Sequence, residues 1–457
     1  MSPVLLITHL VIAIAIILAG IMALKLNAAL SMIIATLYLG IATGMSALDT
    51  VETATTGFGD MMAGIGLPIG FGIILGQLLS DSGGAQTIAD KIMAAFSEKR
   101  AMWAIALAGF VLSIPVFFDV TFVILIPIGL TIAARVNLKM AYVTGFLTIG
   151  ATTAHCVVPP TPNPLAAADI FGFDLGVMLA VGLVVGLITV LASIRLFQLI
   201  HDRLNLWNEE KDVNHSSQVT ADLIAKREAA MEAGKAQPPL LLALVPIIIP
   251  IICILLGTVG SALYEEAPTW SQFFGEKTIA MLLGTLGAYA ISAKYIGWKN
   301  LENSAGDGLK AAGVVLLITG SGGAFASVIA EAGIGDSIVN TLSTDGTPSV
   351  LGAMFLAYLI GMIFRVAQGS GTVAGMTSMT IMATVAPAVG IHPVWIALAC
   401  LSGGNSIGHV NDSGFWVATN MSGLTVTGGL KTYTLGSFIS SVLIFSQALI
   451  GAMLIPL

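Results

Sequence analysis

Apolar runs of about twenty residues recur along most of this 457-residue chain, and they constrain its fold more than any other feature. The first run, residues 4–24, contains no Asp, Glu, Lys or Arg. Only 9% of the chain is charged, whereas a soluble domain carries roughly 25%. The chain therefore cannot cover itself with a surface that suits water. The sequence predicts an all-α, polytopic membrane protein.

Hydropathy predicts about ten membrane spans. These are expected near residues 4–24, 27–45, 61–80, 140–158, 174–198, 239–262, 277–295, 310–330, 393–408 and 432–456. Two further apolar segments, 101–134 and 350–388, are each interrupted by polar residues near the middle. Irregular backbone at membrane depth is tolerated only where it is buried in protein or lines a cavity. The interruptions therefore suggest an internal site.

The distribution of Lys and Arg predicts how these segments are oriented. The hydrophilic linker 199–238 is rich in basic residues and is predicted to be cytoplasmic, whereas 46–60 and 331–349 carry acids and neither Lys nor Arg. Both ends of 101–134 then lie inside and both ends of 350–388 lie outside. Each of these segments is predicted to be a re-entrant helical hairpin, and the two enter from opposite faces. Both chain ends are expected to face outward.

A shift of 250 residues brings the two halves of the chain into register. The shift places TTAHCVVPPTPNP (152–164) on SGGNSIGHVNDSG (402–414), and it places VFFDVTF (116–122) on VAQGSGT (366–372). Because the halves begin on opposite sides of the membrane, the repeat is inverted. Transporters with inverted repeats bind substrate near the bilayer midplane, between broken helices of the two halves.

This symmetry predicts two structural units and a connection between them. The first repeat is 1–198, with the hairpin 101–134 and the broken span 140–165; the linker is 199–238; the second repeat is 239–457, with the hairpin 350–388 and the broken span 393–416. Each repeat then contributes one hairpin tip and one broken span. Four polar breaks are expected to meet at one site.

Asp119 lies between the apolar stretches VFF and VTFVILIPI, at the interruption of the first hairpin. An acidic side chain at membrane depth is costly and by default indicates a functional site. A purely structural alternative is a cap for a helix that starts near Val120. Asp119 is therefore the first candidate for a group that takes up and releases a proton, and Asp412 is the second.

Arg365 lies three residues before the tip of the second hairpin, in GMIFRVAQGSGT. A guanidinium is always charged and binds a carboxylate through two parallel hydrogen bonds. Arg365 is therefore a candidate ligand for a substrate carboxylate, with an ion pair to Asp119 or Asp412 as the structural alternative. Helix N-termini expected after Asp119 and Gly371 would also favour an anion. The tip supplies three more candidate ligands: Gln368, Ser370 and Thr372.

Four prolines within six residues, at positions 159, 160, 162 and 164, follow the apolar segment 140–158. Because proline disrupts a helix, they predict an extended stretch that lines the cavity. Thr161 and Asn163 are then exposed to the substrate. His155, just before the break, is a third candidate ligand, with simple packing as the alternative.

The stretch GGNSIGHVNDSGFW (403–416) concentrates polar groups in otherwise apolar sequence. Its side chains offer donors and acceptors that suit a hydroxyl-rich ligand or an ion. The candidate residues here are Asn405, Ser406, His409, Asn411 and Asp412.

At these breaks the sequence resembles the gluconate:proton symporter family of bacterial permeases, within a wider superfamily of inverted-repeat transporters. The resemblance rests on PVFFDVTFVILIPI, AHCVVPPTPNPLAAA, FRVAQGSGTVAG and GHVNDSGFW, whose order and spacing match over nearly the whole chain. It implies a multi-pass protein of the cell inner membrane that takes up a small hydroxylated carboxylate together with protons. Gluconate, a related sugar acid, glycerate or D-serine would fit. The resemblance also implies alternating access of the elevator type and a homodimer.

Other classes fit the sequence less well. A sodium-coupled carboxylate symporter is the main alternative, because unwound carbonyl groups beside Ser, Thr and Asn also form sodium sites. A passive channel is not expected, since paired hairpins suit alternating access, and neither an enzyme nor ATP coupling is expected without a GxSxG motif or P-loop. The three cysteines show no grouping typical of a metal site or disulfide framework. No cofactor and no nucleic-acid partner are expected beyond the ion gradient, the lipid bilayer and the organic anion.

Overall fold

The computed structural model describes residues 1–96, 100–136, 139–214, 236–264, 266–344, 347–410 and 412–455. Within these residues nearly the whole chain is helical, and nine helical segments are long and apolar enough to cross a membrane. Two short strands, β1 (Ser343–Thr344) and β2 (Thr347–Pro348), pair in antiparallel fashion. The predicted all-α polytopic class is confirmed.

The helices follow the same order in both halves. Those of the first half and the linker are α1 (Pro3–Met22), α2 (Ala28–Ala42), α3 (Ala47–Asp81), α4 (Gly84–Ala94), α5 (Ala101–Leu112), α6 (Phe118–Val136), α7 (Met140–Val157), α8 (Pro162–Phe171), α9 (Leu175–Arg203) and α10 (Glu209–Asp212). Those of the second half are α12 (Leu240–Leu263), α13 (Thr269–Gly275), α14 (Lys277–Ile296), α15 (Trp298–Glu331), α16 (Ile334–Leu342), α17 (Val350–Gln368), α18 (Gly371–Met382), α19 (Ala386–Val389), α20 (Pro393–Gly404), α21 (Ser413–Met421), α22 (Val426–Gly429), the π-helix η2 (Leu430–Thr434) and α23 (Leu435–Leu454).

Each half contains a long helix, a short helix, two helices separated by a break, a broken span and a final long helix. These are α3, α4, α5–α6, α7–α8 and α9 in the first half, and α15, α16, α17–α18, α20–α21 and α23 in the second. This common order supports the predicted repeat. Its inverted orientation in the membrane and the re-entrant course of the hairpins stay predictions.

The long helices α3 and α15 extend well beyond the spans expected at 61–80 and 310–330. They contain 35 and 34 residues, which at 1.5 Å per residue is about 50 Å of helix. A hydrocarbon layer is only about 30 Å thick. The acidic segment 46–60 forms the first turns of α3. Ser46 is the N-cap of this helix, and its side chain accepts a hydrogen bond from the amide of Asp49.

Two expected spans are shorter than predicted. The spans placed at 27–45 and 393–408 contain α2 with 15 residues and α20 with 12. By contrast, α17 in the second hairpin is long and apolar enough to count as a span. In the most apolar 18-residue stretch of the segment from Met140 to Phe171, 94% of the residues are buried, so the first broken span lies inside the fold.

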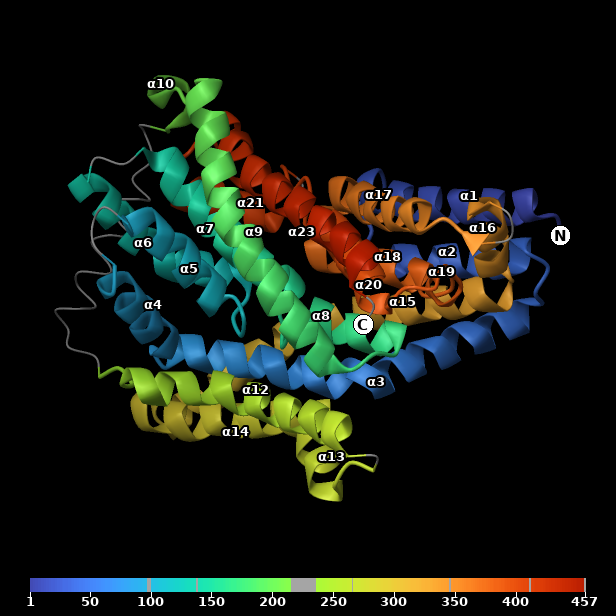
Figure 1. Cartoon of the computed structure of the whole chain (residues 1–457), viewed down its shortest axis with the longest axis horizontal. Helices are drawn as coiled ribbons and strands as arrows, with labels where there is room; N and C mark the ends of the chain where they lie inside the picture. The colour runs from blue at the N-terminus through green and yellow to red at the C-terminus, as the bar shows by residue number, and fades with distance from the viewer. Residues whose placement is uncertain are drawn as a thin grey trace.

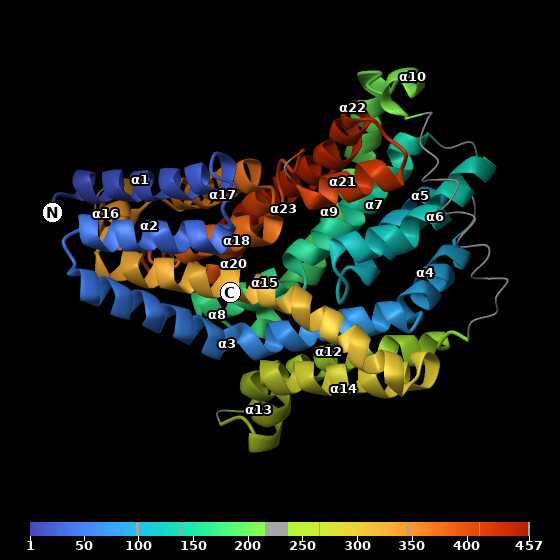
Figure 2. The same ribbon diagram turned by 180° about the vertical axis from the view of Figure 1, so that it is seen from behind.

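The helices form two groups that meet along α3 and α15. These two helices lie side by side along the molecule, and α2 and α14 pack against them (Figure 2). In the other group, α7, α9, α20 and α23 pack together, and the hairpins join them at α7 and α20. The groups touch where α8 contacts α3 and where α18 contacts α15. The breaks of the chain therefore lie in the group beside the long helices.

The backbone of α3 approaches the first half's two breaks closely. A Cβ atom on Gly76 would overlap the carbonyl oxygen of Pro115, in the turn between α5 and α6. A Cβ atom on Gly72 would lie 3.3 Å from the carbonyl oxygen of Pro160, between α7 and α8. Only glycine at position 76 allows this contact without displacement of the break, whereas a Cβ atom at position 72 would require a smaller adjustment.

The ends of the molecule agree with the predicted charge asymmetry. Figure 1 shows α4 and α10 toward one end, and α16 and the chain's N-terminus toward the other. The basic linker begins at the first end, and the acidic start of α3 lies at the second. Which end faces the cytoplasm stays a prediction.

Candidate functional site

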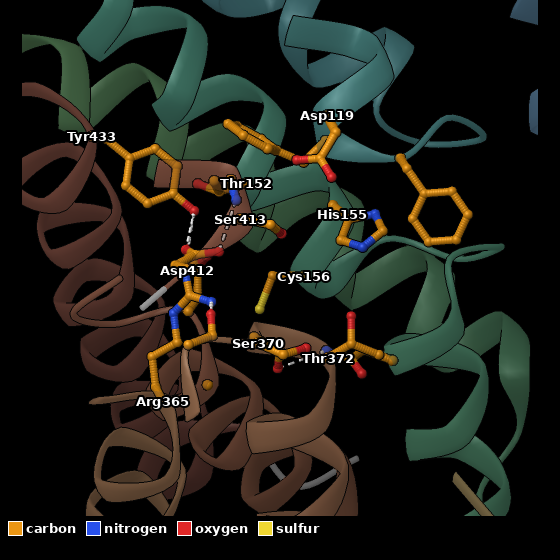
Figure 3. A pocket seen from close by; sticks show the side chains of 18 residues that line it. Asp119, Thr152, His155, Cys156, Arg365, Ser370, Thr372, Asp412, Ser413 and Tyr433 are labelled. Atoms are coloured by element: carbon orange, nitrogen blue, oxygen red, sulfur yellow. Dashed lines mark hydrogen bonds and ion pairs between the residues drawn. The ribbon is translucent and has the colours of Figure 1, made fainter. Parts of the chain in front are cut away.

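A cavity of about 370 Å³ lies where both hairpin breaks and both broken spans meet. Its walls come from the starts of α6, α8, α18 and α21, the ends of α7, α17 and α20, and η2. Figure 3 shows its side chains pointing toward one another from both halves of the chain. The volume falls at the lower end of the range of roughly 300–1,000 Å³ that is typical of small-molecule sites.

The break in the second hairpin is produced by two adjacent residues. Gly369 ends α17 with a φ of 83°, a left-handed conformation that glycine adopts without strain, and its amide donates to the carbonyl of Arg365 at 2.9 Å. Ser370 then caps α18, because its Oγ accepts a hydrogen bond from the amide of Val373 at 3.3 Å. One helix therefore ends at the cavity and the next begins there.

The proline-rich break is shorter than predicted. Pro162 and Pro164 were expected in an extended stretch, but they lie in the first turn of α8. Proline is tolerated there because the first amides of a helix have no partner within the helix. Thr161 and Asn163 are 5% and 4% exposed. Asn163 lines the cavity as predicted, whereas Thr161 does not.

Four helix N-termini face the cavity. Lining residues come from the first turns of α6, α8, α18 and α21, and each of these helices has at least nine residues. The amides of a first turn lack partners within the helix, and the helix dipole places partial positive charge at this end. Such ends bind anions. At α21 a carboxylate already occupies this position, because Asp412 caps the helix, and Asp119 lies in the first turn of α6.

A buried network on one wall joins Arg365, Asp412 and Tyr433. Arg365 Nη2 forms an ion pair with Asp412 Oδ2 and lies 3.1 Å from Tyr433 Oη, while its Nη1 donates to the carbonyl of Gly369. The Tyr433 hydroxyl donates to Asp412 at 2.5 Å. The second oxygen of Asp412 accepts from the amide of Gly414 at 2.9 Å and caps α21. Arg365 and Asp412 are 4% and 5% exposed.

This network corresponds to the structural alternative for Arg365, an ion pair with Asp412. Both Nη atoms have partners, whereas Nε has no hydrogen-bond partner among the described residues. Arg365 still lines the cavity. Direct binding of a substrate carboxylate by Arg365 stays a prediction.

Asp119 lies on the opposite wall, in the first turn of α6 (Figure 3). Its side chain is open to the cavity. Within the described part of the chain its carboxylate has neither a hydrogen bond nor an ion pair. Asp119 and Asp412 therefore face the same space with very different surroundings.

Three other predicted ligands line the cavity with hydrogen-bonding capacity to spare. Asn163 Nδ2 lies 3.4 Å from the carbonyl oxygen of Gly371, which links α8 to α18 across the two halves. The described residues leave Asn163 Oδ1, Asn405 Nδ2 and His155 Nδ1 buried without a partner. Buried polar atoms normally have a partner, so these three are suited to a polar ligand or water. Ser370 and Thr372 line the same space.

The remaining predicted ligands lie apart from the cavity or outside the described residues. Thr161 Oγ1 donates to the carbonyl of Val158 at 2.8 Å, and Ser406 Oγ to that of Gly403 at 2.6 Å. His409 Nε2 lies 3.0 Å from the carbonyl oxygen of Val366. None of the three is among the described residues that line the cavity. Asn411 and the side chain of Gln368 lie outside the described part.

The structure also brings residues to the cavity that the sequence analysis did not single out. Tyr433 lies in a segment predicted as a plain span; it belongs to the π-helix η2, and its hydroxyl donates to Asp412. Its ring also packs edge-on against Phe118 of the first hairpin, with centroids 5.5 Å apart. The other additions flank predicted positions and could have been found from that proximity: Phe117, Phe118, Thr152, Cys156 and Ser413.

Comparisons with known proteins agree with this architecture. Inner membrane permease YgbN of Escherichia coli (strain K12) is 31% identical over 423 residues, which cover 90% of each chain. A gluconate permease of Bacillus subtilis (strain 168) is 32% identical over 427 residues, 92% of this chain and 94% of that protein.

A solved structure shows the same fold at low sequence identity. Neisseria gonorrhoeae MtrF, described among antimetabolite efflux pumps, gives a TM-score of 0.60 at 13% identity, over 89% of this chain and 85% of that one. The family described as GntP family permease matches residues 5–455. The chain therefore belongs to the GntP family of permeases and is a multi-pass transporter of the cell inner membrane.

Proposed function

We propose that this permease takes up a small hydroxylated carboxylate together with protons, by alternating access. Gluconate or a related sugar acid is the first candidate, because the Bacillus subtilis relative is named a gluconate permease. Glycerate and D-serine belong to the same chemical class. The proposal rests on the charges around the cavity.

The cavity favours an anion but carries an acid that opposes one. Four helix N-termini supply partial positive charge. The charge of Arg365 is offset by its ion pair with Asp412. An ionised Asp119, with no cation beside it in the described residues, would leave the three side chains with one net negative charge. A substrate carboxylate would then meet a like charge in a cavity of about 370 Å³.

A proton on Asp119 removes this repulsion. The neutral acid can also donate a hydrogen bond to the bound anion. Proton and substrate therefore favour each other's binding, and this linkage is what symport requires. The single observation that carries the proposal is the contrast between the unpaired Asp119 and the neutralised pair of Arg365 with Asp412. Asp119 is accordingly the proposed coupling residue, ahead of Asp412.

The unpartnered amide atoms support recognition of hydroxyl groups. Asn163 offers an acceptor and Asn405 a donor, and they come from the broken spans of the two halves. Ser370 and Thr372 add hydroxyls on a third side of the cavity. A site built to pair substrate hydroxyls rejects analogues that lack them, because its own buried groups are then left unpaired.

Two groups of helices support an elevator-type motion. The breaks belong to the group of α7, α9, α20 and α23, which borders the long helices α3 and α15. If the helices that carry the breaks moved along α3 and α15, the cavity would pass from one side of the membrane to the other. A homodimer formed through α3, α15 and the helices packed on them would keep these helices in place.

Uptake into proteoliposomes tests the proposal. The purified protein is reconstituted, and accumulation of labelled gluconate is followed under an acid-outside gradient, an imposed sodium gradient, or neither. Accumulation that requires the pH gradient and is lost when a protonophore is added is the expected result. Accumulation that requires only the sodium gradient would show that sodium, and not the proton, is the coupling ion. Glycerate and D-serine, added as unlabelled competitors, rank the substrates.

A further inference from the structure

The short helix α10 of the linker is attached to the π-helix that carries Tyr433. Asp212, the last residue of α10, is fully buried at 0% exposure, and both carboxylate oxygens accept from Lys431 Nζ, at 2.9 and 2.7 Å. Its Oδ2 also accepts from the amide of Asn208 at 2.8 Å. A buried ion pair needs such additional hydrogen bonds to be stable. Asp212 thus meets the conditions for a fixed anchor.

Backbone contacts make the same connection. Val213 and Leu424 form an antiparallel bridge, and the amide of Thr425 donates to the carbonyl of Asp212 at 2.9 Å. Thr425 is the N-cap of α22, which runs directly into η2. Figure 2 shows α10 against α22 at one end of the molecule. The linker therefore holds η2 through both side chain and backbone.

Lys431 and Tyr433 contact different parts of the protein from one short helix. Lys431 reaches Asp212 with its side chain, and its carbonyl oxygen lies 2.9 Å from His201 Nε2. Tyr433, two residues later, donates to Asp412 at 2.5 Å and accepts from Arg365 at 3.1 Å. π-Helices are rare and occur mostly as single turns, often at functional sites. The anchored Lys431 keeps this turn in the register that aims Tyr433 at the network.

We propose that the ion pair between Asp212 and Lys431 is a positioning device for Tyr433, through which the linker sets the substrate affinity of the cavity. Neither residue of the pair lines the cavity. When the pair is broken, η2 relaxes toward an ordinary helix and Tyr433 moves off Asp412. Arg365 then loses the partner that fixes its orientation. The inference rests on the proposed substrate site.

A double-mutant cycle tests this linkage. Asp212→Asn removes the charge but keeps an acceptor for the amide of Asn208. The side chain of Lys431 is 26% exposed and so retains partial contact with water. Asp212→Asn and Tyr433→Phe are each expected to weaken gluconate binding about tenfold, the scale of one hydrogen bond to a charged group. Because both act through the tyrosine hydroxyl, the double variant should also lose about tenfold. Independent effects would multiply to about a hundredfold and would overturn the proposal.

A matched control and a readout without substrate complete the experiment. Asp307→Asn removes the exposed ion pair with Lys310, whose N–O distance is also 2.7 Å, and should leave affinity unchanged. Hydrogen exchange of the amides of 430–434 should rise in Asp212→Asn and stay unchanged in Asp307→Asn. Unchanged exchange in Asp212→Asn would contradict the proposal. Lys431→Gln is the second variant if Asp212→Asn fails to insert.

Hydrogen exchange at η2 tests the positioning role of the linker separately from the proposed substrate. If the wild-type protein does not bind gluconate, the proposed substrate is wrong, and exchange at η2 alone decides whether the linker positions Tyr433. If gluconate binds but the effects of Asp212→Asn and Tyr433→Phe multiply, the substrate assignment stands and the positioning role fails.

Discussion

Two carboxylates face one cavity from the two halves of the chain, and their surroundings differ in almost every respect. Asp412 accepts from Arg365, Tyr433 and the amide of Gly414, and is 5% exposed. Asp119 is open to the cavity and has no partner among the described residues. The two acids are not counterparts in the repeat, because the shift of 250 residues places Asp119 on Gly369 and Pro162 on Asp412, and their environments differ as well.

This difference shows how a repeated architecture can divide two tasks. A carboxylate that is ion-paired and hydrogen-bonded on both oxygens is fixed in position. Asp412 is therefore a structural part of the wall, where it caps α21 and orients Arg365. A carboxylate without partners is free to change its charge as substrate enters and leaves. For this reason we propose Asp119, and not Asp412, as the coupling residue.

The largest expected effect comes from removing titration at Asp119. Asp119→Asn keeps the size of the side chain but cannot release a proton, so gluconate accumulation driven by an acid-outside gradient should be abolished. Exchange of internal for external substrate should persist, since it needs no net proton movement. Proteoliposome uptake measures both activities.

The same assay on Asp412→Asn provides the comparison. If Asp119→Asn still accumulates substrate against its gradient while Asp412→Asn does not, the roles of the two acids are reversed. Loss of exchange in Asp119→Asn would indicate a binding role for Asp119 instead of coupling.

Of the two substitutions Asp412→Asn and Asp119→Asn, Asp412→Asn should reduce the stability of the protein more. It leaves the buried guanidinium of Arg365 without its counter-ion, and breaking a buried ion pair in this way costs about 3–5 kcal/mol. Thermal unfolding of the detergent-solubilised protein should show a clear drop in Tm, with Asp119→Asn as the matched control close to wild type. Equal Tm values would mean that the ion pair contributes little to the fold.

Arg365→Lys should separate the two roles proposed for the guanidinium. Lysine keeps the charge for Asp412 but loses the planar fork. Affinity for gluconate should fall roughly tenfold or more, on the scale of a charged hydrogen bond of about 1.5–3 kcal/mol. Isothermal titration and thermal unfolding are measured together. Normal affinity with a lowered Tm would assign Arg365 a structural role alone.

The smallest effect is expected at His409. Its Nε2 contacts the carbonyl of Val366 and its side chain does not line the cavity within the described residues. His409→Ala should change gluconate affinity by less than about 0.5 kcal/mol, as is usual for surface substitutions. Asn405→Ala, which changes a residue of the same stretch that does line the cavity, is the contrasting variant and should weaken binding. A marked loss in His409→Ala would return this residue to the substrate site.

Local chemistry explains what the sequence alone could predict. Asp119, Arg365 and the prolines at 159–164 are costly or disruptive inside apolar segments, so each marks a break without knowledge of the fold. The shift of 250 residues then predicts that these breaks meet. The structure brings most of the marked polar residues to one cavity.

The features that were missed depend on register and direction, which composition does not encode. In the sequence Tyr433 is an ordinary residue of an apolar segment. In the structure it lies in a π-helix, and its hydroxyl donates to Asp412. Ser406 and Thr161 satisfy nearby backbone carbonyls, an outcome that competes with ligand binding at any helix end. Pro162 starts a helix that its residue type was expected to prevent.

The close approach of α3 to the first half's breaks has a mechanical consequence. At Gly76 and Gly72 the helix lies against the carbonyl groups of Pro115 and Pro160 with no side chain between them. The two elements are therefore in contact through backbone atoms at Gly76, and any movement of α3 relative to the first half's breaks must first relieve this contact.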